Sequence, residues 1–224
     1  MSLSFSLRSI AAILFASTLA WDYVRSSETA LGNFSSWSLF LQFIYFQLPL
    51  KSRALCLVHA LAFITAVSGL LNYVYRLLLD PQLETNNAIK WDIVYNTVIL
   101  RAVLVNFAPT FVHILDVTTN QNQIISSYQG KSRRVMILWC LISPMLLMFL
   151  FEIITSITMS ERDEESLYNN SKDEGFVPFL SNARLVSLVS FLFAFFLLTM
   201  LVLRSAYVPG FQSQRSPRMR TGSK

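Results

Sequence analysis

Charge is scarce in this sequence. Of its 224 residues, 14% are charged and 54% are hydrophobic, and the mean hydropathy is +0.49. A soluble domain normally carries about 25% charged residues, so this chain lacks the charge to cover a surface that faces water. Glycine is scarce too, with six residues, and long apolar runs stand in place of the short alternating strands of a membrane β-barrel. Because helices satisfy their own backbone hydrogen bonds in lipid, we predict an all-α, polytopic membrane protein.

The motifs of soluble enzymes and of metal sites are missing. The sequence contains no Walker loop, no GxGxxG, no GxSxG and no HExxH. Its two cysteines, Cys56 and Cys140, lie in apolar runs without zinc or CxxC spacing, which indicates small buried side chains. The acidic run ERDEE lacks EF-hand spacing. We therefore predict neither a metal nor an organic cofactor.

Six apolar runs approach the length of about 20 residues that a membrane-spanning helix needs. The predicted spans are residues 9–23, 34–50, 54–79, 93–117, 135–159 and 183–203, of which the second is short. A cleaved signal peptide is the alternative for the first span, because Arg8 precedes an apolar stretch that ends in small residues; an uncleaved anchor fits the topology better. The sequence thus predicts a six-helix membrane domain, residues 1–208, and a disordered basic tail, residues 209–224.

Basic residues cluster in alternate loops of this predicted topology. They are Lys51, Arg53, Lys131, Arg133, Arg134, Arg215, Arg218, Arg220 and Lys224. By the positive-inside rule these loops and both termini are cytoplasmic, and Asn169 becomes a glycosylation candidate on the opposite side. The clusters lie beside apolar runs, so we expect membrane lipids as partners and no nucleic acid, despite a net charge of +5. The endoplasmic reticulum and the plasma membrane both fit, and the oligomeric state stays open.

Two ionisable residues lie at similar depths in spans four and five. Such groups are costly in a membrane and usually face the bundle interior or a cavity. At about 1.5 Å per residue, Arg101 lies roughly 13 Å and Glu152 roughly 10 Å below the outer surface. We therefore predict an Arg101–Glu152 ion pair, which serves either helix packing or a binding site.

Span four is the most polar of the six. Asn106, Thr110 and His113 are spaced four and three apart, so they share one helix face. Pro109 lies between them, removes a backbone donor and is expected to kink the helix. Two interpretations of His113 stay open: a hydrogen-bonded interior residue or a site residue. His59 lies among small residues, which favour close helix packing.

Span two begins with the polar sequence SSWS. Ser35, Ser38, Gln42 and Tyr45 are spaced three, four and three apart, and at about 100° per residue they fall in one narrow stripe. We expect this stripe to face the interior of the bundle, close to the outer surface.

This stripe resembles the second span of the androgen-induced integral membrane proteins. In that family the span opens on a threonine, with a polar residue three positions on, a glutamine seven on, and an aromatic pair ten and eleven on. The corresponding places here hold Ser35, Ser38, Gln42, Tyr45 and Phe46. The length, the six spans and the cytoplasmic ends are similar as well, and Asp116 resembles the acidic residue that ends the family's fourth span.

Some members of that family hydrolyse fatty acid esters of hydroxy fatty acids, using the span-two threonine as nucleophile and a span-four histidine. The resemblance therefore implies Ser35 as nucleophile. Counting back from Asp116, Asn106 occupies the place of the histidine, and asparagine cannot act as a general base near neutral pH. His113 lies two turns further from the outer surface than Asn106 and is a poor substitute.

Three functions remain open at this point. The first is an intramembrane hydrolase of lipid esters, with Asn106, Gln42 or Tyr45 as donors to the oxyanion, or a divergent member without that activity. The second is a lipid-binding or lipid-transport protein whose polar interior, with Arg101 and Glu152, holds a headgroup. The third is a scaffold in which these polar residues, Ser38, Thr110 and His113 among them, serve packing alone.

Overall fold

The computed structural model describes residues 3–25, 34–91, 94–159 and 176–207, and every regular element within these ranges is helical. The elements are α1 (Leu3–Arg25), α3 (Phe34–Gln47), α4 (Leu55–Leu79), α5 (Leu83–Trp91), α6 (Tyr95–Ala102), η1 (Val103–Phe107), α7 (Ala108–Thr119), α8 (Gln121–Gln129), α9 (Arg133–Met159), α11 (Phe176–Leu198), η2 (Thr199–Leu203) and α12 (Arg204–Tyr207). The predicted all-α class is confirmed for this part of the chain. The sequon at Asn169 and the tail at 209–224 lie outside it.

Five segments of the described chain are long and apolar enough to cross a membrane. They are Leu7–Val24, Leu55–Leu79, Tyr95–Thr119, Arg133–Phe151 and Val186–Tyr207. The predicted second span is not among them, because α3 has 14 residues and extends only about 21 Å, against a hydrocarbon core about 30 Å thick. The helix stops early because Pro49 disfavours the helical conformation of the residue before it. An integral membrane protein is thus indicated by five segments, and the count of six stays a prediction.

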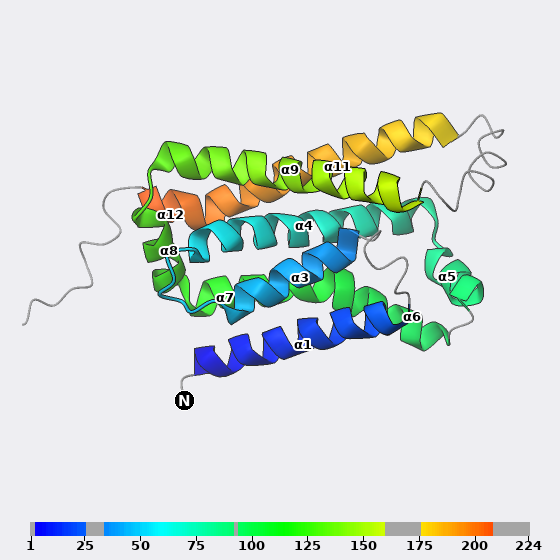
Figure 1. Cartoon of the computed structure of the whole chain (residues 1–224), viewed down its shortest axis with the longest axis horizontal. Helices are drawn as coiled ribbons and strands as arrows, with labels where there is room; N and C mark the ends of the chain where they lie inside the picture. The colour runs from blue at the N-terminus through cyan, green and yellow to red at the C-terminus, as the bar shows by residue number, and fades with distance from the viewer. Residues whose placement is uncertain (1–2, 26–33, 92–93, 160–175, 208–224) are drawn as a thin grey trace, which may run out of the picture.

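The helices form an elongated bundle around α4, which packs against α3, α7, α9 and α11 (Figure 1). In this view α9 and α11 lie on one side of α4, with α3, α7 and α1 on the other. The first described residues of α1 lie at the same end of the bundle as α8 and α12, while α5 lies at the opposite end. We call these the α8 end and the α5 end.

The outer faces of α9 and α11 carry large apolar side chains. Leu146 and Phe149 on α9 are 61% and 62% exposed, and Val189 and Phe196 on α11 are more than half exposed. A water-facing surface rarely presents contiguous apolar area of this kind. These faces are therefore suited to contact lipid.

The predicted irregularity of span four is a π-helical turn. In η1 the backbone N–H of Ala108 donates to the carbonyl of Val103, five residues back. Pro109 follows directly; it has no N–H for the carbonyl of Val105 and its ring crowds that carbonyl. The helical turn before Pro109 is therefore wider than an α-helical turn and forms a π-bulge.

Candidate functional site

A cluster of four polar side chains lies inside the α8 end of the bundle. The guanidinium of Arg8 on α1 donates from Nη1 to Oδ2 of Asp116 on α7 at 2.5 Å. The phenol of Tyr45 on α3 donates to the same oxygen, and Nδ2 of Asn120 donates to Oδ1 at 2.7 Å. Asp116 is fully buried and Arg8 is 5% exposed. We call these residues the Asp116 cluster.

Arg8 also closes the C-terminal end of α3. Its Nη2 donates to the carbonyl oxygens of Tyr45 at 2.7 Å and of Leu48 at 3.0 Å. The last carbonyls of a helix have no partner within the helix, so a basic side chain there satisfies them. The guanidinium also lies over the rings of Tyr45 and Phe46, 4.7 and 5.3 Å from their centroids. The Asp116 cluster therefore fastens α1, α3 and α7 together, and its carboxylate already accepts three hydrogen bonds.

His113 lies next to this cluster, fully buried, with its ring stacked on Tyr45 at 4.6 Å. Its Nε2 is hydrogen-bonded to Oε1 of Gln42, whose Nε2 donates to the carbonyl of Ala62 at 3.0 Å. The carbonyl of Ala62 fixes the amide orientation, so Gln42 presents an oxygen to His113 and the proton lies on His113 Nε2. In neutral His113 the lone pair then lies on Nδ1, a buried atom without a hydrogen-bond partner.

His59 on α4 stands beside His113, with ring centroids 5.7 Å apart. It is fully buried, and its Nδ1 lies 2.8 Å from the hydroxyl of Tyr128 on α8. Burial raises the pKa of the Tyr128 phenol well above its usual range, so the hydroxyl keeps its proton. His59 Nε2 has no hydrogen-bond partner. The two histidines thus form a pair in which each ring is anchored through one nitrogen.

The polar stripe on α3 faces inward at three of its four positions. Ser38, Gln42 and Tyr45 are buried, whereas Ser35 is half-buried. The inward orientation is confirmed for these three residues, and their role stays a prediction.

Ser35 has no histidine beside it. It precedes Gln42, the partner of His113, by seven residues, which is about 10 Å along the helix. His59 bonds to Tyr128 at the α8 end, and the chain has no third histidine. The predicted oxyanion donor Asn106 uses its Nδ2 to bond the carbonyl of Ala102 in its own helix at 3.1 Å. The described residues thus bond both histidines to side chains other than Ser35, and the catalytic role of Ser35 stays a prediction.

Arg101 pairs with an acidic residue that the sequence reasoning overlooked. Its Nε and Nη2 donate to the two carboxylate oxygens of Asp22 on α1, at 2.7 and 2.9 Å. This bidentate pair joins α1 to α6 near the α5 end (Figure 1). The side chain of Glu152 lies outside the described residues, so the Arg101–Glu152 pair stays a prediction.

Thr110 follows the expectation for span four, since it is buried on the same helix as His113. Its hydroxyl is buried and has no hydrogen-bond partner. Among the described residues, no three His, Cys, Asp or Glu side chains are arranged to hold a metal ion. Cys56 and Cys140 are buried free thiols, as the sequence indicates.

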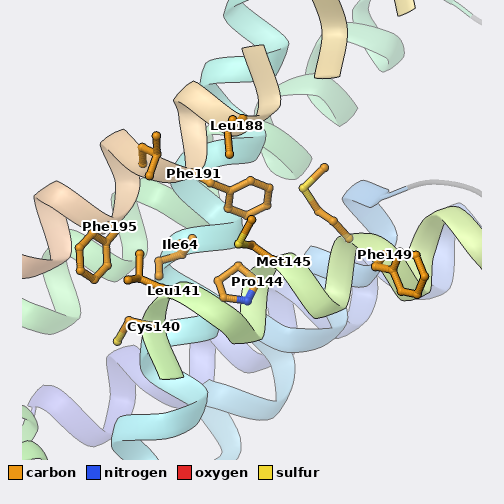
Figure 2. A pocket seen from close by; sticks show the side chains of 11 residues that line it. Ile64, Cys140, Leu141, Pro144, Met145, Phe149, Leu188, Phe191 and Phe195 are labelled. Carbon is orange, nitrogen blue, oxygen red and sulfur yellow. The ribbon is translucent and has the colours of Figure 1, made fainter. Parts of the chain in front are cut away.

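An apolar groove lies on the other side of α4, between α9 and α11 (Figure 2). Its volume is about 340 Å³. The lining residues are Ile64, Cys140, Leu141, Pro144, Met145, Met148, Phe149, Leu188, Phe191, Leu192 and Phe195. None of them is charged, and Ile64 of α4 lies between the two helices that form the walls. No sequence signal pointed to this groove, because single apolar residues in a span do not show which of them face a neighbour.

Comparisons with known proteins add nothing to this description: no family model matches the chain, and no curated protein or solved structure matches it.

Proposed function

We propose that this chain is a six-pass membrane protein that binds the acyl chain of a membrane lipid in the groove between α9 and α11. The observation that carries the proposal is the groove itself. Its volume of about 340 Å³ is within the range of ligand pockets, about 300–1,000 Å³. Its walls belong to three segments long enough to span the membrane, so at this depth the surrounding medium consists of acyl chains.

The proposed sixth pass is α3. Both ends of the described bundle, the start of α1 and α12, lie at the α8 end, which favours an even number of passes (Figure 1). α3 packs against α1 and α4 and connects them, and it supplies the missing pass although it is short. Under the positive-inside rule, the α8 end with Lys51, Arg53 and Lys131 is cytoplasmic.

The polar interior supports binding over catalysis. The Asp116 cluster is saturated with internal hydrogen bonds and joins three helices, which is what a structural cluster does. Ser35, the nucleophile that the family resemblance implies, lies about two turns along α3 from Gln42, the residue that His113 bonds. A nucleophile without a base within hydrogen-bond reach is not activated.

Filling the groove should strongly reduce the amount of bound lipid. We expect Met145→Trp, at a lining position 55% exposed, to lower the occupancy of bound dioleoylphosphatidylcholine at least fivefold. The matched control is Leu146→Trp, because the neighbouring residue is 61% exposed and does not line the groove. Native mass spectrometry of the purified protein in detergent measures the bound lipid. Equal retention by both variants and the wild type would rule out the groove as the binding site.

A hydrolase is the second candidate, and one observation favours it. His113 presents a buried Nδ1 lone pair without a protein partner, as a general base would. The nearer hydroxyl on α3 is that of buried Ser38, one turn before Gln42, rather than that of Ser35.

A fluorophosphonate probe distinguishes the two functions. If the chain only binds lipid, the purified protein should show no labelling above that of a heat-denatured sample. Labelling that is lost in Ser38→Ala and kept in Ser35→Ala would establish a hydrolase with Ser38 as nucleophile. The reverse pattern would establish Ser35, as the family resemblance implies.

A further inference from the structure

Two arginines lie on α9 in the same helical rows as residues that line the groove. Arg133 and Arg134 precede Cys140 and Leu141 by seven residues each on α9. Seven residues are almost two full helical turns, so each arginine shares a row with a lining residue, about 10 Å nearer the α8 end. Both side chains are exposed. A pair of exposed arginines thus lies beyond the apolar groove on one of its two helices, and we call this position the cationic mouth.

The α8 end carries no exposed negative charge in the part of the chain that the structure describes. Four acidic side chains have described surroundings: Asp22, Asp80, Glu84 and Asp116. Asp116 alone lies at the α8 end, where it is fully buried and bonded to Arg8. Among the side chains that the structure describes, no exposed carboxylate thus lies near the arginines of α9.

Contacts between α8 and α12 hold the chain in place just before this mouth. The hydroxyl of Tyr207 lies 3.0 Å from the carbonyl oxygen of Tyr128 and 3.2 Å from that of Lys131. These bonds fix the connection that leads into α9, and with it the positions of the two arginines. Long basic side chains at such a place can extend along apolar surface and keep their charged groups in the headgroup layer.

We propose that the groove selects an anionic glycerophospholipid, with one acyl chain between α9 and α11 and its phosphate on Arg133 and Arg134. The inference rests on the proposed acyl-chain site and deepens it by naming the lipid class. Guanidinium groups bind phosphate oxygens through paired hydrogen bonds. An anionic headgroup, unlike the zwitterionic headgroup of phosphatidylcholine, carries no positive group that would repel the two arginines.

The test compares dioleoylphosphatidylglycerol with dioleoylphosphatidylcholine in competition on the purified full-length protein, read by native mass spectrometry. We expect the wild type to prefer the anionic lipid and Arg133→Gln/Arg134→Gln to lower that preference by roughly 30-fold, since each basic residue near an anionic headgroup contributes roughly fivefold. The control is Lys51→Gln/Arg53→Gln, which removes the same charge from the α3–α4 connection and should keep the preference.

The outcomes separate this inference from the acyl-chain proposal. Met145→Trp should weaken the binding of both lipids. Arg133→Gln/Arg134→Gln should still bind both lipids and lose only the preference for the anionic one. An unchanged preference in the arginine variant, or an equal loss in the control, overturns the headgroup site and leaves the groove intact. If glycerol phosphate, which has no acyl chain, competes as well as the lipid, the headgroup site is independent of the groove.

Discussion

Asp116→Ala should destabilise the folded protein by about 3–5 kcal/mol, the largest effect expected of a single substitution in this chain. Asp116 is fully buried and is the carboxylate partner of Arg8, which is 5% exposed. Without it, a guanidinium remains inside the bundle with no opposite charge, and the phenol of Tyr45 and the amide of Asn120 lose their acceptor. In a domain of this size the loss corresponds to a fall of about 10 °C in the midpoint of thermal unfolding, measured in detergent micelles.

The matched control is Asp22→Ala, which breaks the other described ion pair. The side chain of Arg101 is 24% exposed, against 6% for Arg8. After the substitution Arg101 can regain solvent or headgroup contacts, so we expect a smaller loss, about 1–2 kcal/mol. Comparable losses in the two variants would contradict the view that burial of Arg8 decides the effect.

A double variant separates the charge from the hydrogen bonds. Arg8→Met/Asp116→Leu removes both charges together, and a buried ion pair replaced by apolar residues is often neutral in stability. Here we expect recovery of only part of the loss, because Tyr45, Asn120 and the carbonyls at the end of α3 stay without partners. No recovery at all would mean that the uncompensated charge is not the main cost of Asp116→Ala.

The helices were predictable from the sequence because their signal is local. Runs of apolar residues specify where a helix lies in lipid, and all six predicted spans fall on described helices. The length of α3 was overestimated because residues 48–50 are apolar, yet Pro49 ends the helix at Gln47. Hydropathy shows where a helix lies in lipid, but it does not show at which residue the helix ends.

The partners of the polar residues were not predictable in the same way. The depth estimate paired Arg101 with Glu152, whose side chain lies outside the described residues, and did not consider Asp22, next to the last residue of predicted span one. Asp22 on α1 nevertheless bonds to Arg101 on α6. Depth alone does not determine which helices are neighbours.

The same limit applies to the histidines. His113 bonds to Gln42, which follows Ser35 by seven residues, about 10 Å along α3. The hydrogen bond joins residues 71 positions apart, and no pattern within either span encodes it. What the sequence did provide is the face of α3 on which Gln42 lies.

Gln42→Leu should cost about 1–2 kcal/mol, because it removes the acceptor of a fixed imidazole donor. His113 Nε2 carries the proton that Gln42 accepts, and at 0% exposure it finds no water to replace that bond. The loss is smaller than for Asp116→Ala since no net charge is left behind. The midpoint of thermal unfolding in detergent measures it, with Gln47→Leu as the control, because Gln47 is exposed on the same helix.

Because Gln42 and His113 are hydrogen-bonded to each other, a second substitution should reverse the loss of stability caused by Gln42→Leu. Gln42→Leu/His113→Phe replaces both partners by apolar groups, which is nearly neutral when the shapes are kept, so stability should return to within about 0.5 kcal/mol of the wild type. His113→Phe alone should cost about as much as Gln42→Leu, since it leaves the Gln42 oxygen buried and unpaired. If the two single losses simply add in the double variant, Gln42 and His113 are not coupled, and the hydrogen bond between them does not stabilise the fold.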